Sequence, residues 1–321
     1  SDVIVPIAEV SLKAEYAART IRPKINRLLD NYLVKWEPEV LQHPSMGLQM
    51  SGIDLSDVDA VLKPMCLDRK VGAVSGFFKG GTSQAKKRLI GFLGKRLTAY
   101  VQNSNQPQTD DISHMSPYLH FGQISPLQIA LSASKLGSKK DEAKTAFLEQ
   151  LVVRRELAIN FVYFEPHYDS YKALPNWAKK TLEDHKKDKR QWHYSRQQLE
   201  RANTHDDYWN AAMQEMKTTG FMHNYMRMYW GKKILEWYKS PQQAFKTILA
   251  LNNKYFLDGR DANSYAGVAW IFGVHDRAWA ERPIFGKVRY MAASGLERKC
   301  DIGAYVNKVN RLAVVRPFQL K

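Results

Sequence analysis

Three tryptophans and a tyrosine in the second half of the chain could pass an electron if they lie close together. Trp230 and Trp237 are seven residues apart, which puts both on one face of a helix, and Tyr229 adjoins the first of them. Trp209 comes from a separate element. Each ring taken singly is typical of a packed core. The sequence leaves core packing and an electron-hopping path both open.

Polar side chains gather in a glycine-bearing turn further along the chain. Asp258, Arg260 and Asp261 offer two carboxylates and a guanidinium within four residues. Arg227 could pair with Asp258 and hold that carboxyl group ionised. Trp270 stands between small residues and could be a stacking platform, although a solvated loop is the ordinary interpretation of each part.

Two earlier segments could also contribute to a site. Residues 113–125 (SHMSPYLHFGQIS) contain a helix start at Ser116-Pro117, where free backbone amides suit a phosphate group. A capped helix–loop junction explains the same residues. In residues 148–163, Arg154 and Arg155 fall on different helix faces, so only one of them can easily face a shared pocket. A surface ion pair is the alternative there.

Charge and composition limit the class of protein. The chain has 321 residues, and 48 Lys and Arg against 32 Asp and Glu give a formal net charge of +16. Such a surplus attracts polyanions, with nucleic acid as the leading candidate, although it can also serve solubility alone. Cys66 and Cys300 are too few for a disulfide framework, and no Cys/His cluster has zinc spacing. His185 and His193 have the charged neighbours of surface histidines. Neither a membrane-spanning apolar run nor a signal peptide is present.

Apolar periodicity predicts a mainly α-helical chain. Val3–Ile7 is a short β-branched run that we expect to be the stub of a strand. The predicted helices cover residues 14–29 with an interruption at Pro23, then 57–62, 83–101, 124–136, 144–162, 177–182, 208–218, 221–238, 240–251 and 302–309. The pattern predicts an all-helical domain of roughly 300 residues.

Four long motifs resemble class II cyclobutane pyrimidine dimer photolyases, and the resemblance runs from about Val3 to Val309. These motifs are SPYLHFGQIS at 116–125, MHNYMRMYWGKKILEW at 222–237, LNNKYFLDGRD at 251–261 and HDRAWAERPIFGKVRYM at 275–291. The family has an N-terminal α/β antenna domain followed by a helical FAD-binding domain. The resemblance therefore implies that residues 1–12 are a remnant of the first domain and residues 13–321 the helical FAD domain, which leaves the antenna pigment unknown.

The resemblance also implies roles for individual residues around FAD. Arg227 and Asp258 would form the ion pair beside the flavin ring. Asn252 would sit at its N5, where a neutral amide favours the reduced anion, FADH⁻. Arg260 would help to frame the site. The diphosphate and ribityl chain would lie on Tyr100, Ile112, Ser113, His114, Met115 and Ser116.

For electron transfer and substrate binding, the resemblance implies a second set. Trp230 would be the ring nearest the flavin and Trp209 the outer one, with Tyr229 and Trp237 as nearby alternatives. Trp270 would stack on a pyrimidine dimer flipped out of DNA, a step that photolyases already exemplify among base-flipping enzymes. Arg277 and Arg289 would fill the gap in the duplex or bind its backbone.

The implied reaction is redox-neutral, because light drives an electron from FADH⁻ to the dimer and the electron returns after the ring opens. One departure bears on this step. Gln150 stands where the family usually has Glu, and an amide can donate a hydrogen bond to the dimer but supplies neither charge nor a proton. We therefore expect binding to persist with a lower yield per photon.

Two smaller departures concern substrate binding. The stretch from Trp270 to His275 is one residue shorter than usual, and Arg154 stands where some members carry another tryptophan. The expected partner is ultraviolet-damaged DNA, bound by an intracellular monomer. The alternatives are a cryptochrome-like blue-light sensor and a basic helical DNA-binding protein without flavin. The class II motifs favour repair over the first, and Asn252, Arg227 and Asp258 speak against the second.

Overall fold

The computed structural model describes residues 2–37, 39–40, 42–43, 45–74, 76–137 and 141–315. Helices dominate, as predicted, and the only strand-like pairing in these ranges is a single bridge between Arg282 and Gly286. The α-helices are α1 (Ile7–Val10), α2 (Ala18–Tyr32), α3 (Val58–Leu62), α4 (Thr82–Lys95), α5 (Tyr100–Asn103), α6 (Ser116–His120), α7 (Pro126–Ser134), α8 (Glu142–Leu148), α9 (Arg155–Phe164), α10 (Asn176–Asp184), α11 (Arg196–Glu200), α12 (Asp207–Thr219), α13 (Asn224–Trp237), α14 (Pro241–Tyr255), α15 (Ala262–Ile271), α16 (Ala293–Lys299) and α17 (Ile302–Val315).

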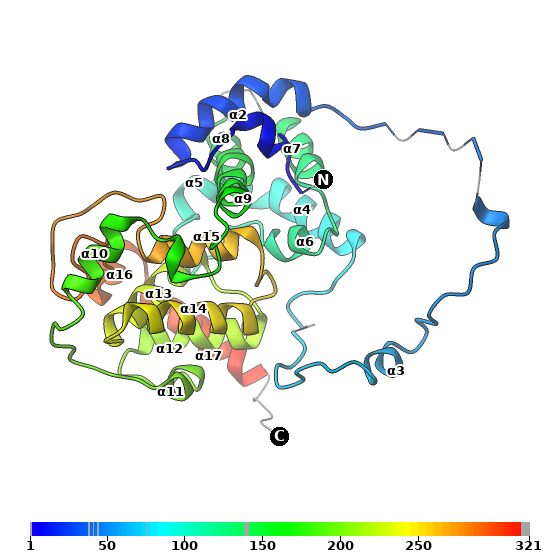
Figure 1. Ribbon diagram of the computed structural model, residues 1–321. Helices are drawn as coiled ribbons and strands as arrows, with labels where there is room; N and C mark the ends of the chain where they lie inside the picture. Colours follow the sequence, from blue (N-terminus) through cyan, green and yellow to red (C-terminus); the bar gives the residue numbers. More distant parts are fainter. Residues whose placement is uncertain are drawn as a thin grey trace.

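Two apolar clusters form the core, and α9 contributes to both. The first is built from the N-terminal helices and contains Phe92 and Phe147, with Leu157 from α9. The second is built from α10 to α17 and contains Trp209 and Trp230, with Phe161 from α9. The ribbon therefore has two helical groups that meet along α9 and α15 (Figure 1). Every site residue discussed below lies in one of these groups or at their junction.

Three expectations about secondary structure were wrong, one about a strand and two about helices. Val3–Ile7 forms no strand, because the backbone amides of Ile4 and Val5 donate to the buried Glu156 carboxylate instead. Helix α2 runs through Pro23, where the loss of one backbone hydrogen bond is outweighed by burial of Ile21 and Ile25 on either side.

The third concerns residues 83–101, which break into α4, a 3-10 turn at Leu97–Ala99 and α5. The break turns the Tyr100 ring edge-on against Phe92 and Phe147. The predicted helix at 144–162 is continuous, but Glu149–Arg154 has π-helical hydrogen bonding. π-Turns of this kind are frequent at functional sites.

The α12–α13 turn is held close to the α14–α15 turn by a glycine. Gly220 ends α12 with a left-handed φ of +70°, and a Cβ there would lie 2.7 Å from Leu257 Cγ. The Leu257 amide donates to the Gly220 carbonyl at 2.9 Å. This contact sets the start of α13 beside residues 256–258, and so places Arg227 within reach of Asp258.

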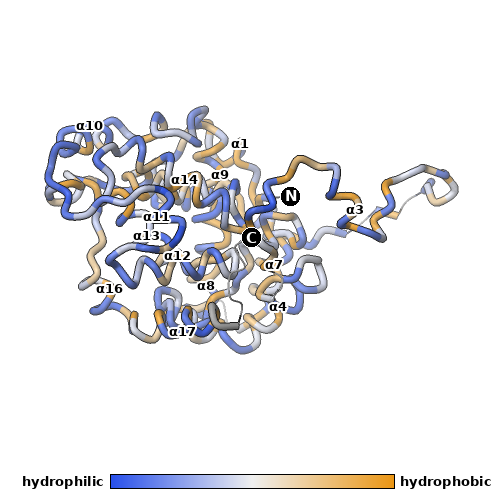
Figure 2. The backbone as a smooth tube through the Cα atoms, turned by 90° about the horizontal axis from the view of Figure 1, so that it is seen from below, coloured by the Kyte–Doolittle hydropathy of each residue, from blue (hydrophilic) through white to orange (hydrophobic). Residues whose placement is uncertain are grey.

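Between α2 and α4 the described residues from Val34 to Ala73 form an arm that leaves the helical body, and the chain is back on that body at Phe78, which packs on the N-terminal cluster (Figure 1). Several apolar side chains on this arm are exposed, and the coloured tube shows apolar stretches along it (Figure 2). Trp36 is 73% exposed and Met50 is 86% exposed. The arm contains the short helix α3 and contributes little to either apolar cluster.

Candidate functional site

The predicted pair between Arg227 and Asp258 is present. Arg227 lies in the first turn of α13, and its Nη2 is 3.1 Å and 3.4 Å from the two carboxylate oxygens of Asp258. Both side chains are largely buried. The guanidinium also lies over the Phe256 ring, 3.8 Å from its centroid. The guanidinium and the carboxylate thus form a buried, charge-assisted contact at the start of α13.

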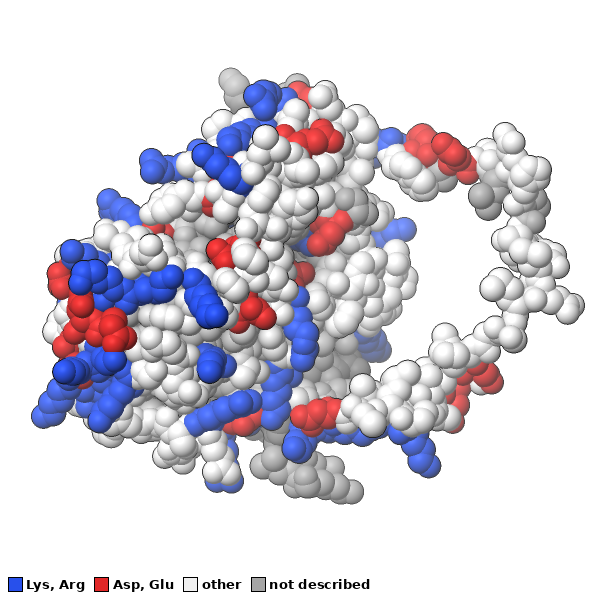
Figure 3. All heavy atoms as spheres, viewed as in Figure 1, with Lys and Arg blue, Asp and Glu red and all other residues white. Residues whose placement is uncertain are grey.

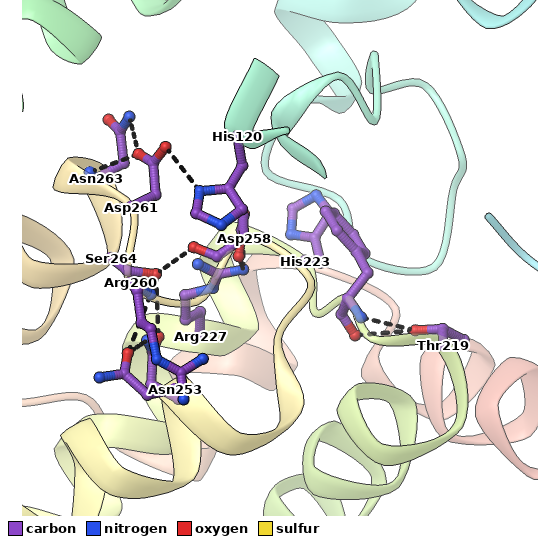
Figure 4. A network of polar contacts seen from close by, with 12 residues as sticks. His120, Thr219, His223, Arg227, Asn253, Asp258, Arg260, Asp261, Asn263 and Ser264 are labelled. Atoms are coloured by element: carbon purple, nitrogen blue, oxygen red, sulfur yellow. Dashed lines mark hydrogen bonds and ion pairs between the residues drawn. The ribbon is translucent and has the colours of Figure 1, made fainter. Parts of the chain in front are cut away.

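Amide side chains extend this polar centre (Figure 4). Asn252 is buried, and its Nδ2 donates to Asn253 Oδ1 at 3.0 Å. Ser264 donates to the Asp258 carbonyl at 2.8 Å and lies 3.5 Å from Asn252 Oδ1. The Arg260 amide donates to Asn253 Oδ1, with a left-handed φ of +67° at Arg260. The structure thus brings the backbone of Arg260 to the centre, whereas its side chain is exposed.

The predicted phosphate-binding segment lies beside both turns. His114 has a left-handed φ of +53°, and its Nε2 is 2.7 Å from Asp110 Oδ1. The His114 ring is 4.7 Å from that of Phe221, just ahead of α13. His120 Nδ1 approaches Asp261 Oδ2 at 3.4 Å across the other turn. The remaining predicted members of the segment flank His114 and lead into α6, which begins at Ser116. They are Ile112, Ser113, Met115 and Ser116.

Tyr100 belongs instead to the packing of the N-terminal cluster. Its ring is 5.8 Å from each of the Phe92 and Phe147 rings, both edge-on. Burial of the phenol raises the pKa of Tyr100 to about 12, so the hydroxyl stays protonated and can donate.

Several buried donors around this centre have no partner within the described residues. They include Arg227 Nε and His223 Nε2. Burial lowers the pKa of His223 to about 3, so its ring is neutral. Because His223 Nδ1 accepts from the Tyr225 amide, its Nε2 carries the proton and is a donor. Unpaired buried donors are costly, and acceptor oxygens of a ligand would satisfy them.

The predicted aromatic residues form a connected chain. The Trp230 and Trp209 rings stack at 6.4 Å with an interplanar angle of 12°, and Trp237 lies edge-on to Trp209 at 5.3 Å. Trp230 is also 6.4 Å from Phe256, the ring beneath Arg227. The chain of rings therefore begins at the polar centre. Tyr229 lies apart from this stacking and donates its hydroxyl hydrogen to Asp206.

Trp209 is not the outer ring, because it has no exposed surface. The contacts continue from Trp237 to Tyr194, with the ring centroids 4.9 Å apart. The Tyr194 hydroxyl is 2.6 Å from His205 Nδ1, and the His205 ring stacks on Trp192 at 4.3 Å. Trp192 is 41% exposed and so reaches solvent. Sequence reasoning missed these three residues, although the aromatic pair at 192 and 194 was a visible signal.

A cavity of about 710 Å³ lies on another side of α13. Trp270 and Arg289, both predicted to bind substrate, are among its lining residues, together with Trp279 and Lys232. The Lys232 ammonium is fully buried and donates to the Ile271 carbonyl, at the end of α15. Burial lowers the pKa of Lys232 to about 7. The lysine thus caps the helix that carries Trp270.

Trp279 is a residue that sequence reasoning missed. Arg277 and Arg289 both lie over its ring, at 5.2 Å and 5.0 Å from the centroid. Its indole N–H points to the Asp276 carboxylate, 3.2 Å from Oδ1. Trp279 therefore brings the two predicted DNA-binding arginines together at the rim of the cavity.

Gln150 and Arg154 lie on the π-helical segment. Gln150 is exposed, and Arg154 Nε is 3.6 Å from Glu149 Oε1. Neither residue is among the described residues that line the cavity with Trp270. Their predicted roles stay predictions.

Comparison with known proteins identifies the family. No protein-family model matches the chain. The deoxyribodipyrimidine photo-lyase of Methanothermobacter thermautotrophicus is 50% identical over 313 residues, which cover 97% of this chain and 68% of the relative. The chain belongs to the photolyase/cryptochrome superfamily. A photo-lyase of the same name from Oryza sativa is 45% identical, with 97% of this chain and 62% of the relative covered.

A solved structure supports the fold of this superfamily member. A class III photolyase from Agrobacterium tumefaciens superposes with a TM-score of 0.67 at 17% identity, over 96% of this chain and 60% of that one. The described helices include none that is long and apolar enough to cross a bilayer. The same residues contain no cluster of three or more side chains suited to a metal ion.

Proposed function

We propose that this chain is the catalytic, FAD-binding region of a class II photolyase and splits cyclobutane pyrimidine dimers in DNA under blue or near-ultraviolet light. The observation that carries the proposal is the match, over nearly the whole chain, to several proteins named deoxyribodipyrimidine photo-lyase at 42–50% identity. The chain spans 57–68% of the lengths of these relatives.

The residues around Arg227 and Asp258 fit FAD. The unpaired donors of Arg227 and His223 suit the oxygens of the diphosphate and of the flavin ring. Bound FAD, as FADH⁻, would supply the excited electron for the dimer. Arg227 would hold negative charge beside the ring, and the neutral Asn252 amide would face it without adding charge.

The other proposed roles use the cavity and the ring chain. Trp270 would stack on the extruded dimer while Arg277 and Arg289 hold the DNA around it. The chain from Trp230 through Trp209 to Trp237 would bring electrons in from the surface when the flavin needs reduction. These roles are consistent with rings in contact and with the two arginines placed together beside Trp279.

A visible spectrum and a repair assay test the proposal. The purified protein should show flavin absorption, and illumination with a dimer-containing oligonucleotide should restore the ultraviolet absorbance of its bases. Flavin without recovery would instead support a light sensor, for which the match to Arabidopsis thaliana Cryptochrome-2, 30% identical over 46% of the chain, gives weaker support. A folded but colourless protein would contradict both. Circular dichroism serves as the folding control.

A further inference from the structure

The loop between α15 and α16 carries a concentrated positive charge. We call residues 276–290 the basic loop, because it contains four cations, Arg277, Arg282, Lys287 and Arg289, against Asp276 and Glu281. Apart from the bridge between Arg282 and Gly286, this loop has no regular structure. Its two sides are joined by backbone hydrogen bonds within the loop, such as the one from the Trp279 amide to the Lys287 carbonyl at 2.8 Å.

The loop is anchored to the helical body by α10 and the residues that follow it. In Figure 1 the basic loop, drawn in orange, passes around α10. The Lys287 amide donates to Thr181 Oγ1 at 3.0 Å, and the Ile284 amide donates to Asp188 Oδ2 at 2.7 Å. Gly286 packs so tightly that a Cβ there would lie 2.1 Å from Thr181 Oγ1. Residues 181–190 thus form the base on which the loop rests.

His185 joins this base to the loop through its ring. Its Nδ1 is 2.6 Å from Asp188 Oδ2, and its Nε2 is 2.9 Å from Glu281 Oε1 in the basic loop. Both ring nitrogens face carboxylates. Only the imidazolium cation can donate to both, since a neutral ring has one N–H. We call the ring with these two contacts the clamp, and both of its hydrogen bonds form only when the ring is charged. The expectation that His185 is an ordinary surface histidine did not include these contacts.

The groups around the clamp agree with this charge. The hydrogen bonds that the ring donates to Glu281 and then to Asp188 raise the pKa of His185 above its usual value. Arg190 donates to the carbonyls of His185, Lys186 and Asp188. The Lys186 ammonium is paired with Glu183. Two carboxylates therefore face the ring, and neither neighbouring cation takes its place.

We propose that His185 is a positioning residue for DNA binding: as a cation it ties Glu281 to the base, and so holds Arg277 and Arg289 in their DNA-contacting arrangement. The proposal rests on the proposed function, because it takes these two arginines as DNA contacts. The clamp also pairs the Glu281 carboxylate, which adjoins Arg282 in the chain. This pairing reduces the repulsion between that carboxylate and DNA phosphates.

The sign of the pH dependence follows from the raised pKa. The cation and both of its contacts are present below that pKa, and one contact is lost as pH rises through it. DNA affinity should therefore fall as the pH is raised from about 6 to about 9, across the range in which a shifted histidine titrates. If His185 had no part in positioning the arginines, its titration would not lower the DNA affinity over this pH range.

Affinity for a dimer-containing duplex, measured at fixed salt across this range by fluorescence anisotropy, tests the proposal. We expect the wild-type affinity to fall roughly three- to tenfold as the clamp opens. The His185→Gln variant should bind the duplex weakly and show no fall in affinity across this pH range. In Glu281→Gln, the fall in affinity should move to lower pH. His167→Gln, at an exposed histidine away from the loop, is the matched control and should follow the wild type. A His185→Gln curve that superimposes on the wild-type curve would overturn the proposal.

A second readout follows the loop without DNA. Trypsin should cut the basic loop faster at high pH in the wild type, and at every pH in His185→Gln, relative to cuts in the exposed arm between α2 and α4. Equal ratios in the two proteins would also overturn the clamp. If the ratios differ but no variant binds damaged DNA, the clamp stands and the proposed function is what fails.

Discussion

At the scale of single residues, the site depends on buried charges and donors that are each tied to one particular partner. Asp258 is held by Arg227, and Asn252 by Asn253 and Ser264. Arg227 Nε remains available for a ligand. Substitutions here should therefore act on cofactor binding and on stability together.

Arg227→Met tests the buried pair. The variant would leave the Asp258 carboxylate buried without a counter-charge, so the free energy of unfolding should fall by about 3 kcal/mol. Flavin retention should fall with it. Urea denaturation and the flavin-to-protein absorbance ratio measure the two effects. Arg201→Met, at an exposed arginine, is the control, and an equal loss of stability there would contradict the explanation.

Gln150→Glu tests the departure at the dimer. A carboxyl group in this position could stabilise the reduced dimer, so the repair quantum yield should rise while affinity for damaged DNA stays within about twofold. Actinometry of the repair reaction measures the yield. A lower yield in the variant would contradict the role assigned to Gln150.

At the scale of elements, helices far apart in the chain meet through single side chains. Glu156 in α9 accepts hydrogen bonds from the Ile4 and Val5 amides at 2.8 Å and 3.1 Å. This contact fastens the residues ahead of α1 to the middle of the fold. The aromatic chain instead joins two consecutive helices, because Trp209 comes from α12 and Trp237 from α13.

The Glu156 carboxyl predicts a pH dependence of stability. Burial raises its pKa from 4.5 to about 7, only partly offset by the two amides and Arg155. The folded state thus binds a proton that the unfolded state releases, so this group adds stability as pH falls from 7 towards 4.5. Glu156→Gln keeps the acceptor without the charge, and should raise stability above pH 7 by on the order of 1 kcal/mol.

Thermal melts over this pH range check the Glu156 prediction. Glu156→Ala is the contrasting variant, because it leaves two buried amides without an acceptor and should be less stable at every pH. A Glu156→Gln protein that is as unstable as Glu156→Ala would contradict it.

Trp237→Phe tests the electron path between α12, α13 and the surface. The variant should lose most photoreduction of oxidised flavin, because the contact from Trp209 to Tyr194 passes through this ring. Repair by protein reduced chemically beforehand should be unchanged. Transient absorption and the repair assay separate the two. Unimpaired photoreduction would show that electrons enter by another route.

Apolar periodicity in the sequence predicted the helical class. The residue types and the long motifs predicted the Arg227–Asp258 contact. It did not reveal Tyr194 and His205 as neighbours of Trp237, or Trp192 as a neighbour of His205, since these contacts depend on the course of the chain between α10 and α12. The clamp at His185 was hidden for a similar reason. Its partner Glu281 is 96 residues away, and no local pattern signals the contact.

At the scale of the whole molecule, the charge of +16 is distributed over the surface unevenly. In the view of Figure 3, Lys and Arg side chains gather on the side of α10, where the basic loop also lies. A surface of this kind attracts DNA from a distance and binds its phosphates on contact.

Salt dependence measures those contacts. If the four cations of the basic loop each meet a phosphate, the logarithm of the affinity should fall with the logarithm of salt concentration with a slope of about −3 to −4. Arg289→Ala should reduce that slope by about one if Arg289 binds the backbone, and leave it unchanged if Arg289 fills the gap in the duplex. A slope near zero for the wild type would contradict DNA binding through this loop.

Gly220 shows what this architecture means for mutational tolerance. The residue touches none of the proposed ligands, yet two independent conditions restrict it, a φ of +70° and a neighbour 2.7 Å from where a Cβ would lie. A saturation library selected for repair should therefore accept almost nothing but glycine there, whereas a library at the exposed Arg201 should accept many residues. In such a map of tolerated substitutions, Gly220 would be as restricted as the residues that bind the ligands, because it holds the α12–α13 and α14–α15 turns together.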